Sequence, residues 1–277
     1  MQKDFLCNKK KPTFAKSETK QNLMTDKLKT EGKFTYAEAG EGPAIIVLHG
    51  LMGALSNFEG TFNYFSNNGY RVLIPELPLY SLPLLKTNVK NLTLFLKDFM
   101  AHKKIDKAIL LGNSLGGHIA LYFTKHYKGK VTALVLTGSS GLYEKAMGDS
   151  FPKRGNYEYI EQKARAVFYN PEVATKEMVD GVYEIVNNRN TVLKTLAIAK
   201  SAIRHNMAND LPEMKQPTCI IWGKQDAVTP PEVAVDFQKL LPDAELFWID
   251  ECGHAAMMEK PEEFNKFLHD WLISKKI

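Results

Sequence analysis

Cysteine is scarce in this sequence, with only Cys7, Cys219 and Cys252 among 277 residues. An odd, widely spaced set of this kind fits neither a disulfide framework nor the ligand spacing of a zinc finger. The sequence therefore predicts a reduced, intracellular setting, and we expect a cytoplasmic protein. Cys252 stands two residues before His254, but neighbours at this spacing in a loop usually point apart, so we do not expect a catalytic Cys/His pair.

Long apolar runs are also absent. No run approaches the roughly 20 residues that a helix needs to span a bilayer, and Asp4 and the lysines at 9–11 interrupt any apolar segment that could resemble a secretion signal. Because 44% of the residues are nevertheless hydrophobic, the chain can bury a sizeable core. We expect a soluble globular protein without a membrane partner.

Most of the chain has no marked excess of positive or negative charge. Residues 1–23 contain six lysines against Asp4 and Glu18, and this accounts for most of the formal net charge of +5. The rest of the chain is almost neutral and offers no basic footprint for a phosphate backbone. We therefore expect no nucleic-acid partner, and we expect residues 1–26 to be a disordered basic arm.

Several cofactor motifs are not found. The sequence has no G-x-G-x-x-G after its first buried strand, no G-x-x-x-x-G-K-[ST] and no H-E-x-x-H. The first two motifs bind dinucleotides and nucleotide phosphates, and the third binds a catalytic zinc ion. We expect neither a cofactor nor a metal site.

The chain does contain short runs rich in β-branched residues that alternate with helical periodicity. Strands buried on both faces have such continuous apolar runs, and alternation with helices predicts βαβ units in a doubly wound, mostly parallel α/β sheet. The strand-like runs cover 44–48, 70–75, 108–111, 131–136, 218–222 and 245–249, after an alternating segment at 33–38. The helix-like segments of this core cover 58–67, 89–102, 115–127 and 261–273.

The strand pattern stops between residues 141 and 211, where the sequence has helical periodicity instead, in segments at 156–168, 175–187 and 191–201. The pattern resumes at residue 218. We predict a core formed by 27–140 and 212–277, with a helical insertion at 141–211.

The clearest chemical signal is Gly112-Asn113-Ser114-Leu115-Gly116, which matches G-x-S-x-G. It lies between a strand-like and a helix-like segment, which is the context that a nucleophile elbow requires. The glycines allow a turn sharp enough to raise the serine hydroxyl above the sheet. Ser114 is therefore the predicted nucleophile.

A serine hydroxyl needs a general base and a group that orients this base. His254 and Asp226 each follow a predicted strand, so both belong at the edge of the sheet where the parallel strands end. The chain order Ser, Asp, His is that of an α/β-hydrolase triad. Asp250, four residues before the histidine, is the alternative acid, but Asp226 is favoured because it follows a separate strand.

An acyl-transfer site also needs two N–H donors for the oxyanion. We predict that these are the backbone amides of Leu115, directly after the nucleophile, and of Leu51, in the glycine-containing loop after the strand at 44–48. Met52 is the alternative to Leu51. His49 is expected to shape this loop rather than to bind a ligand.

At these residues the sequence resembles the α/β-hydrolase superfamily, from about residue 27 to residue 275. The resemblance rests on His49-Gly50 with Gly53, on Gly112 to Gly117, on Gly223-Lys224-Gln225-Asp226, and on Gly253-His254 followed by Glu259-Lys260-Pro261. It implies that residues 141–211 form a cap over the active site. The aspartate nucleophile of haloalkane dehalogenases and epoxide hydrolases is replaced by Ser114.

Within the superfamily, the cap and the C-terminal part are similar to meta-cleavage-product hydrolases, which cut carbon–carbon bonds. This sequence has Val182 where those enzymes carry a cap arginine, and Ala255 where they have a tryptophan. Without that arginine, a dienolate substrate would lack its cationic partner. The sequence also departs from a glycine-containing loop of its relatives at residues 75–81.

The leading hypothesis is therefore a carboxylic-ester hydrolase that acts on a small molecule with an apolar portion. Apolar residues of the cap, Phe168, Tyr169, Tyr183 and Leu193, are candidates for the pocket lining or for the core of the cap. A carbon–carbon bond hydrolase, a cofactor-free perhydrolase on the same triad, and a small-molecule receptor with slow turnover are the alternatives.

Overall fold

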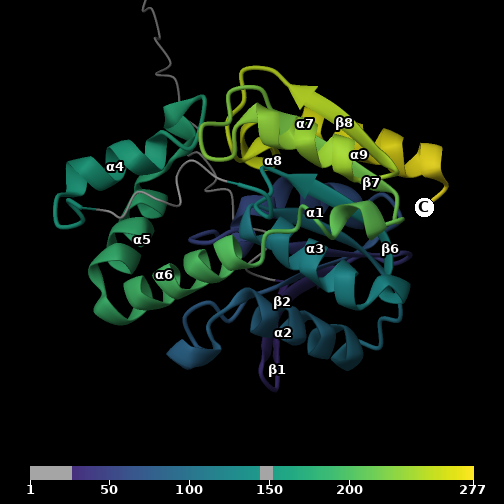
Figure 1. Cartoon of the computed structure of the whole chain (residues 1–277), viewed down its shortest axis with the longest axis horizontal. Coiled ribbons are helices and arrows are strands. Elements are labelled where there is room, and N and C mark those ends of the chain that lie inside the picture. The colour runs from purple at the N-terminus through teal and green to yellow at the C-terminus, as the bar shows by residue number, and fades with distance from the viewer. Residues whose placement is uncertain (1–26, 144–151) are drawn as a thin grey trace, which may run out of the picture.

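The computed structural model describes residues 27–143 and 152–277, and its centre is a twisted eight-stranded sheet (Figure 1). The strand order is β1-β2-β4-β3-β5-β6-β7-β8. β1 and β2 pair antiparallel, β2 pairs antiparallel with β4, and all other pairs are parallel. The bounds are β1 Leu28–Glu31, β2 Phe34–Ala39, β3 Ala44–Leu48, β4 Arg71–Pro75, β5 Ala108–Asn113, β6 Val131–Thr137, β7 Thr218–Gly223 and β8 Ala244–Ile249.

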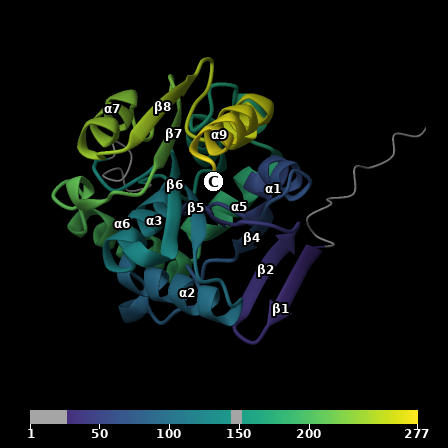
Figure 2. The same ribbon diagram turned by 90° about the vertical axis from the view of Figure 1, so that its right-hand side faces the viewer.

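Helices cover both faces of the sheet, as Figure 2 shows. α2 (Val89–His102), α3 (Leu115–His126) and α7 (Pro231–Leu240) pack on one face, and α1 (Glu59–Ser66) and α9 (Pro261–Lys275) pack on the other. Successive residues of a strand point to opposite faces, so Ile46 and Leu110 join the first layer whereas Ile45 and Ile109 join the second. Both layers exclude water from the sheet, which explains why the predicted strands are continuously apolar.

In the described residues between β6 and β7, three α-helices project from one end of the sheet (Figure 1): α4 (Tyr157–Arg165), α5 (Lys176–Asn187) and α6 (Arg189–Arg204). Their N-termini are capped by the side chains of Asn156, Thr175 and Asn188, which accept hydrogen bonds from amides of the first turn. The helical character predicted for this insertion is thus observed in its described residues.

Short elements complete the described chain. They are α8 (Ala256–Glu259) and the 3₁₀ helices η2 (Leu55–Phe58), η3 (Leu84–Lys86), η4 (Lys128–Lys130), η6 (Pro171–Val173) and η7 (Leu211–Glu213). Within residues 27–143 and 152–277, no helix is both long and apolar enough to cross a bilayer. The arm predicted at residues 1–26 lies outside the described residues.

β1, α7 and α8 were not among the predicted elements. All four residues of β1 are exposed, so this edge strand has no hydrophobic alternation to reveal it. The helix α7 did carry a signal, because Pro231 occupies its first turn and Val233, Ala234 and Phe237 form a buried face.

Candidate active site

The Ser114 backbone forms a strained turn between β5 and α3. Its φ of 52° and ψ of −122° lie outside the regions that non-glycine residues normally occupy. Two hydrogen bonds hold the turn: the Ser114 N–H donates to the Thr137 carbonyl (3.2 Å), and the Ser140 N–H donates to the Ser114 carbonyl (3.1 Å). The turn places Ser114 at the N-terminus of α3, as expected for a nucleophile elbow.

Close backbone packing explains the glycines around this serine. A Cβ atom on Gly112 would lie 2.3 Å from the Gly117 nitrogen, and one on Gly116 would lie 1.9 Å from the Leu48 carbonyl oxygen. Neither contact can be relieved by a side-chain rotation, since the opposing atoms belong to the backbone. The elbow is therefore pressed directly against the end of β3.

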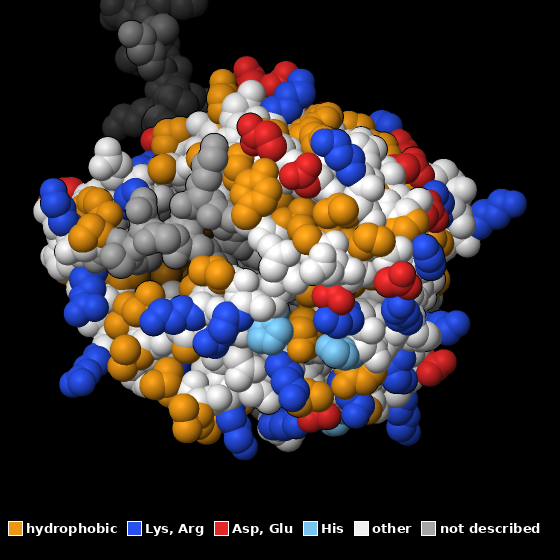
Figure 3. Space-filling model, viewed as in Figure 1, with side chains coloured by type: hydrophobic (Ala, Val, Ile, Leu, Met, Phe, Trp, Pro, Cys, Tyr) orange, Lys and Arg blue, Asp and Glu red, His pale blue; other side chains and the backbone are white. Residues whose placement is uncertain are grey.

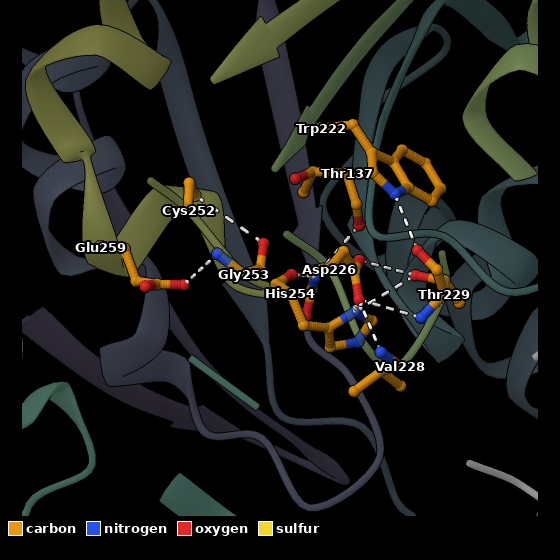
Figure 4. Close-up of polar contacts among 10 residues, drawn as sticks. Thr137, Trp222, Asp226, Val228, Thr229, Cys252, Gly253, His254 and Glu259 are labelled. Carbon is orange, nitrogen blue, oxygen red and sulfur yellow. Dashed lines mark hydrogen bonds and ion pairs between the residues drawn. The ribbon is translucent and has the colours of Figure 1, made fainter. Parts of the chain in front are cut away.

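His254 and Asp226 form a buried pair (Figure 4). The imidazole Nδ1 lies 2.9 Å from Asp226 Oδ2 and 3.2 Å from Oδ1, and the carboxylate has no exposed surface. A carboxylate only accepts hydrogen bonds, so Nδ1 carries a proton and donates a hydrogen bond to Asp226. This contact leaves Nε2 as the ring nitrogen that can act as a base.

The Asp226 carboxylate is itself held by the residues that follow it. Its Oδ1 accepts hydrogen bonds from the N–H groups of Val228 (2.8 Å) and Thr229 (2.9 Å), and its Oδ2 accepts one from the Thr229 hydroxyl (2.8 Å). The indole of Trp222 donates to the Thr229 carbonyl and fixes this turn from β7 (Figure 4). Thr229 was not among the predicted site residues, although an aspartate that accepts from amides two and three residues later is typical of such a turn.

The elbow and the histidine loop are joined directly. The side-chain amide of Asn113 donates to the carbonyls of His254 (3.1 Å) and Thr137 (3.0 Å). Gly138 lies against the imidazole, since a Cβ there would be 2.7 Å from His254 Nδ1. Ser114 and His254, which are 140 positions apart in the sequence, are thus on adjacent loops at one edge of the sheet.

The loop after β3 lies beside the elbow. A hydrogen bond from the Gly53 N–H to the Gly50 carbonyl closes a turn with Leu51 and Met52 at its centre, and Met52 adopts a left-handed φ of 65°. A Cβ on Gly50 would lie 3.3 Å from the Ser114 Cβ. Leu115 begins α3, so its N–H has no acceptor within the helix.

His49 has a structural role in this loop. Its Nδ1 donates to the Gly50 carbonyl (3.0 Å) and its Nε2 accepts from the Leu77 N–H (3.1 Å), which fixes the neutral tautomer. Burial lowers its pKa, although the Gly50 carbonyl acts in the opposite direction. His49 therefore joins the loop after β3 to the loop after β4.

The loop before His254 contains two alternative catalytic residues, Asp250 as the orienting acid and Cys252 as a nucleophile, and neither has the contacts that its role would need. Asp250 is exposed and binds Gln225 and Lys224, and these contacts lower its pKa to about 2. Cys252 is buried, and desolvation with the nearby Glu259 and Asp226 carboxylates raises the pKa of its thiol to about 12. A thiol in this state is a poor nucleophile.

Glu259 connects the histidine loop to the segment between α4 and η6. Its Oε1 accepts from the Gly253 N–H (2.8 Å), and its Oε2 accepts from the N–H groups of Tyr169 (2.8 Å) and Asn170 (3.2 Å). The His254 N–H also donates to the Val167 carbonyl (2.9 Å). Glu259 was recognised from the sequence only as part of a motif, and this connection was not predicted.

Two of the apolar residues considered for a pocket are largely open to solvent. Leu193 is 43% exposed on the outer face of α6, and Tyr169 is 49% exposed. Tyr183 is partly buried and donates to the Gly155 carbonyl, and Phe168 packs on the core. Within the described ranges, no group of three or more His, Cys, Asp or Glu side chains could hold a metal ion.

The fold and these residues together are those of an α/β hydrolase. A family model described as alpha/beta hydrolase fold matches residues 43–166 and 182–261, so the chain belongs to this family of hydrolases.

The individual matches carry different descriptions. The chain is 58% identical to MGS-MChE2, an alpha/beta hydrolase enzyme from the metagenome of sediments from the lagoon of Mar Chica, Morocco, with a TM-score of 0.76 over 90% of this chain and 99% of that chain. It is 28% identical over 258 residues to 2-hydroxy-6-oxo-6-phenylhexa-2,4-dienoate hydrolase of Comamonas testosteroni, covering 86% of this chain and 90% of that protein. A thermophilic esterase from Thermogutta terrifontis shares the fold at 18% identity, with a TM-score of 0.69 over 87% of this chain and 93% of that one.

Proposed function

We propose that the protein is a carboxylic-ester hydrolase with Ser114 as nucleophile, His254 as general base and Asp226 as the orienting acid. Ser114 Oγ attacks the ester carbonyl carbon and its proton passes to His254 Nε2. The departing alcohol takes this proton. Water then attacks the acyl-enzyme, loses a proton to Nε2, and releases the carboxylic acid as Ser114 regains the proton.

The backbone amides of Leu51 and Leu115 are the proposed oxyanion donors. Leu115 directly follows the nucleophile and begins α3, and the turn that contains Leu51 contacts the elbow at Gly50. Both amides belong to backbone that is already fixed, so they could stabilise the developing charge without rearrangement.

The observation that carries this proposal is the Asn113 hydrogen bond to the His254 carbonyl. It joins a strained serine turn to a buried histidine–aspartate pair whose tautomer leaves Nε2 unprotonated, as a general base requires. An unreactive structural serine would need neither the strain nor the buried pair.

We further propose that residues 141–211 act as a cap on a core formed by 27–140 and 212–277. Two contacts support this division: Glu259 binds the amides of Tyr169 and Asn170, and Lys194 Nζ on α6 donates to the Tyr80 carbonyl (2.7 Å). Both contacts join the helical insertion to core segments that follow the C-terminal ends of strands. A small substrate with an apolar portion would bind between them.

Carbon–carbon bond hydrolysis on the same residues is the second candidate. It is favoured by the similarity to the dienoate hydrolase over most of both chains. α5 has the partly buried Val182 where such enzymes are expected to carry an arginine, so ester hydrolysis remains the stronger proposal.

The decisive experiment combines a fluorescent fluorophosphonate with p-nitrophenyl esters of increasing acyl length. The wild type and Ser114→Ala are compared with the control Ser66→Ala. Ser66 lies on α1, and among the described residues its hydroxyl bonds only to the Asn63 carbonyl. We expect labelling and turnover in the wild type and the control, and neither in Ser114→Ala. A vinylogous 1,5-diketone is assayed in parallel.

The outcomes separate the candidates. Loss of both signals in Ser114→Ala alone supports the ester hydrolase, and the preferred acyl length measures the pocket. Faster cleavage of the diketone than of every ester would support the carbon–carbon hydrolase instead. A folded wild type that is neither labelled nor active would refute both and favour a receptor role.

A further inference from the structure

The outer face of α6 carries an exposed row of aliphatic and basic side chains. Leu193, Leu196 and Ile203 are 43%, 42% and 63% exposed. They recur at helical spacing with three exposed cations, so they share one face of the helix. We call this row the α6 stripe, and it consists of Arg189, Leu193, Leu196, Lys200, Ile203 and Arg204. The opposite face of α6 is buried on the rest of the protein.

A second apolar surface adjoins the α6 stripe. On η3, which contacts α6, Leu84 is 44% exposed and Leu85 is 95% exposed. The position of α6 is fixed beside it, because the Val89 N–H at the start of α2 donates to Ser201 Oγ (3.1 Å). Figure 3 shows hydrophobic and basic side chains alternating over the lower left of the molecule, where Figure 1 places α6.

Acidic residues are missing from the segments that form this surface. Residues 77–97 and 185–209 contain no Asp or Glu, although the whole chain has 31. The first segment carries three lysines and the second carries two lysines and two arginines, and of these seven cations only Lys194 is buried. Acids appear only beyond the segments, as at Asp98, which pairs with Lys33, at Asp210, which pairs with Lys125, and at the exposed Glu184 of α5.

We propose that the α6 stripe and η3 dock the protein on the surface of an anionic lipid bilayer. Exposed leucines flanked by lysines and arginines are typical of helices that lie in a membrane interface, where the aliphatic groups enter the acyl boundary and the cations meet acidic headgroups. A second copy of the chain fits poorly, because pairing the stripe with itself would bring cations together. Nucleic acid would leave the leucines in water.

This docking surface differs from what the sequence analysis expected. No membrane partner was predicted because no apolar run could span a bilayer, but a peripheral surface does not need such a run. The pattern was hidden because its residues come from two segments about 100 positions apart.

The docking surface lies close to the candidate active site. Tyr80, whose carbonyl binds Lys194 of α6, follows β4 in the loop that His49 holds through the Leu77 N–H. If the proposed function holds, docking would bring the catalytic edge of the sheet near the bilayer, where apolar esters concentrate. The docking itself does not depend on catalysis.

The test is sedimentation of the full chain with phosphatidylcholine vesicles that contain either no phosphatidylglycerol or 30% of it. The variants are Leu196→Glu and Lys200→Glu. The matched controls are Ile273→Glu, a 62% exposed isoleucine on α9, and Lys107→Glu, an exposed lysine before β5. The lysines of residues 1–23 are present in every protein, so differences between variants report on the stripe alone.

We expect the wild type to bind the anionic vesicles, with binding that weakens as salt is added. Each stripe variant should bind about tenfold or more weakly than the wild type, since each removes a contact and adds a negative charge at the surface. Both controls should bind like the wild type. Ser114→Ala should also bind like the wild type, which separates this inference from the proposed function.

Leu85→Trp gives a second measurement, because an inserted tryptophan is quenched by brominated lipid. Quenching in anionic vesicles supports docking through η3. Equal binding by the stripe variants and the controls would overturn the proposal and assign any binding to charge elsewhere. Dimerisation that Leu196→Glu abolishes, without vesicle binding, would show that the surface joins two copies instead.

Discussion

Asp226→Asn should convert His254 to the wrong tautomer. The carboxylate Oδ1 accepts from two backbone amides, those of Val228 and Thr229, and Oδ2 faces His254 Nδ1 at 2.9 Å. In the variant, the amide oxygen must take the Oδ1 place, because an NH₂ group there would oppose two N–H donors. The NH₂ group then occupies the Oδ2 place and donates to Nδ1.

The geometry also sets the size of the effect. The reverse orientation would leave the part-buried N–H of Val228 and the buried N–H of Thr229 without their acceptor, at about 1–3 kcal/mol each, so it is populated by only a few per cent of molecules. With Nδ1 as an acceptor, the ring proton moves to Nε2, which can then no longer accept the proton of Ser114. We expect kcat to fall by about 10³- to 10⁴-fold, as for a triad whose orienting acid is replaced by its amide.

The assay is steady-state hydrolysis of the preferred p-nitrophenyl ester, together with the rate of fluorophosphonate labelling. Asp250→Asn is the matched control, because Asp250 binds Lys224 and Gln225 at the surface and should retain wild-type kcat within about twofold. Circular dichroism checks that both variants are folded. If Asp226→Asn keeps more than a tenth of the wild-type kcat, the tautomer argument is wrong.

Further outcomes follow from other parts of the structure. Gly112→Ala should prevent folding of the elbow, because its Cβ would meet backbone at 2.3 Å, whereas Gly155→Ala, with nothing within 4 Å, should keep the melting temperature within a degree or two; expression and thermal melts compare them. Burial alone would raise the pKa of Glu38, but hydrogen bonds from Arg71 and Lys103 outweigh it and lower the pKa to about 2. This carboxylate should therefore stabilise the fold above about pH 4.5, by about 1–2 kcal/mol after screening, and lose that contribution as the pH falls through 2; urea unfolding of wild type and Glu38→Gln should show a smaller gap at pH 3 than at pH 7. Cys252 should react with a thiol reagent only after unfolding, because burial raises its pKa to about 12; rapid modification of Cys252 in native protein, located by mass spectrometry, would contradict this.

Much of the fold was predictable because its strands are buried on both faces. The runs at 44–48 and 131–136 coincide with β3 and most of β6, since a parallel strand covered by helices must be apolar throughout. β1 could not be found this way, because all of its side chains face solvent. The prediction thus depended on continuous burial together with β-branched composition.

The candidate site was predictable where a residue type is tied to a special backbone. Ser114 in its glycine-rich turn is the clearest example. Its left-handed φ belongs to a sharp turn that needs glycines at fixed positions, so the turn leaves a recognisable motif in the sequence. The residues that hold the triad carry no comparable signal. The Thr229 hydroxyl donates to the Asp226 carboxylate within one irregular turn, and Glu259 accepts from backbone N–H groups of two separate loops, so only the folded chain shows these contacts.

The bonds of Glu259 also limit how caps could be exchanged between related hydrolases. The segment from Val167 to Asn170 contributes backbone groups to the loop of His254, so this part of the insertion belongs structurally to the catalytic edge. In a chimaera joined at the ends of the insertion, residues of another protein would replace the backbone groups that contact the loop of Gly253 and His254. A graft that keeps residues 167–170 with the host and exchanges only α5 and α6 should preserve the histidine loop while changing the surface that meets the substrate.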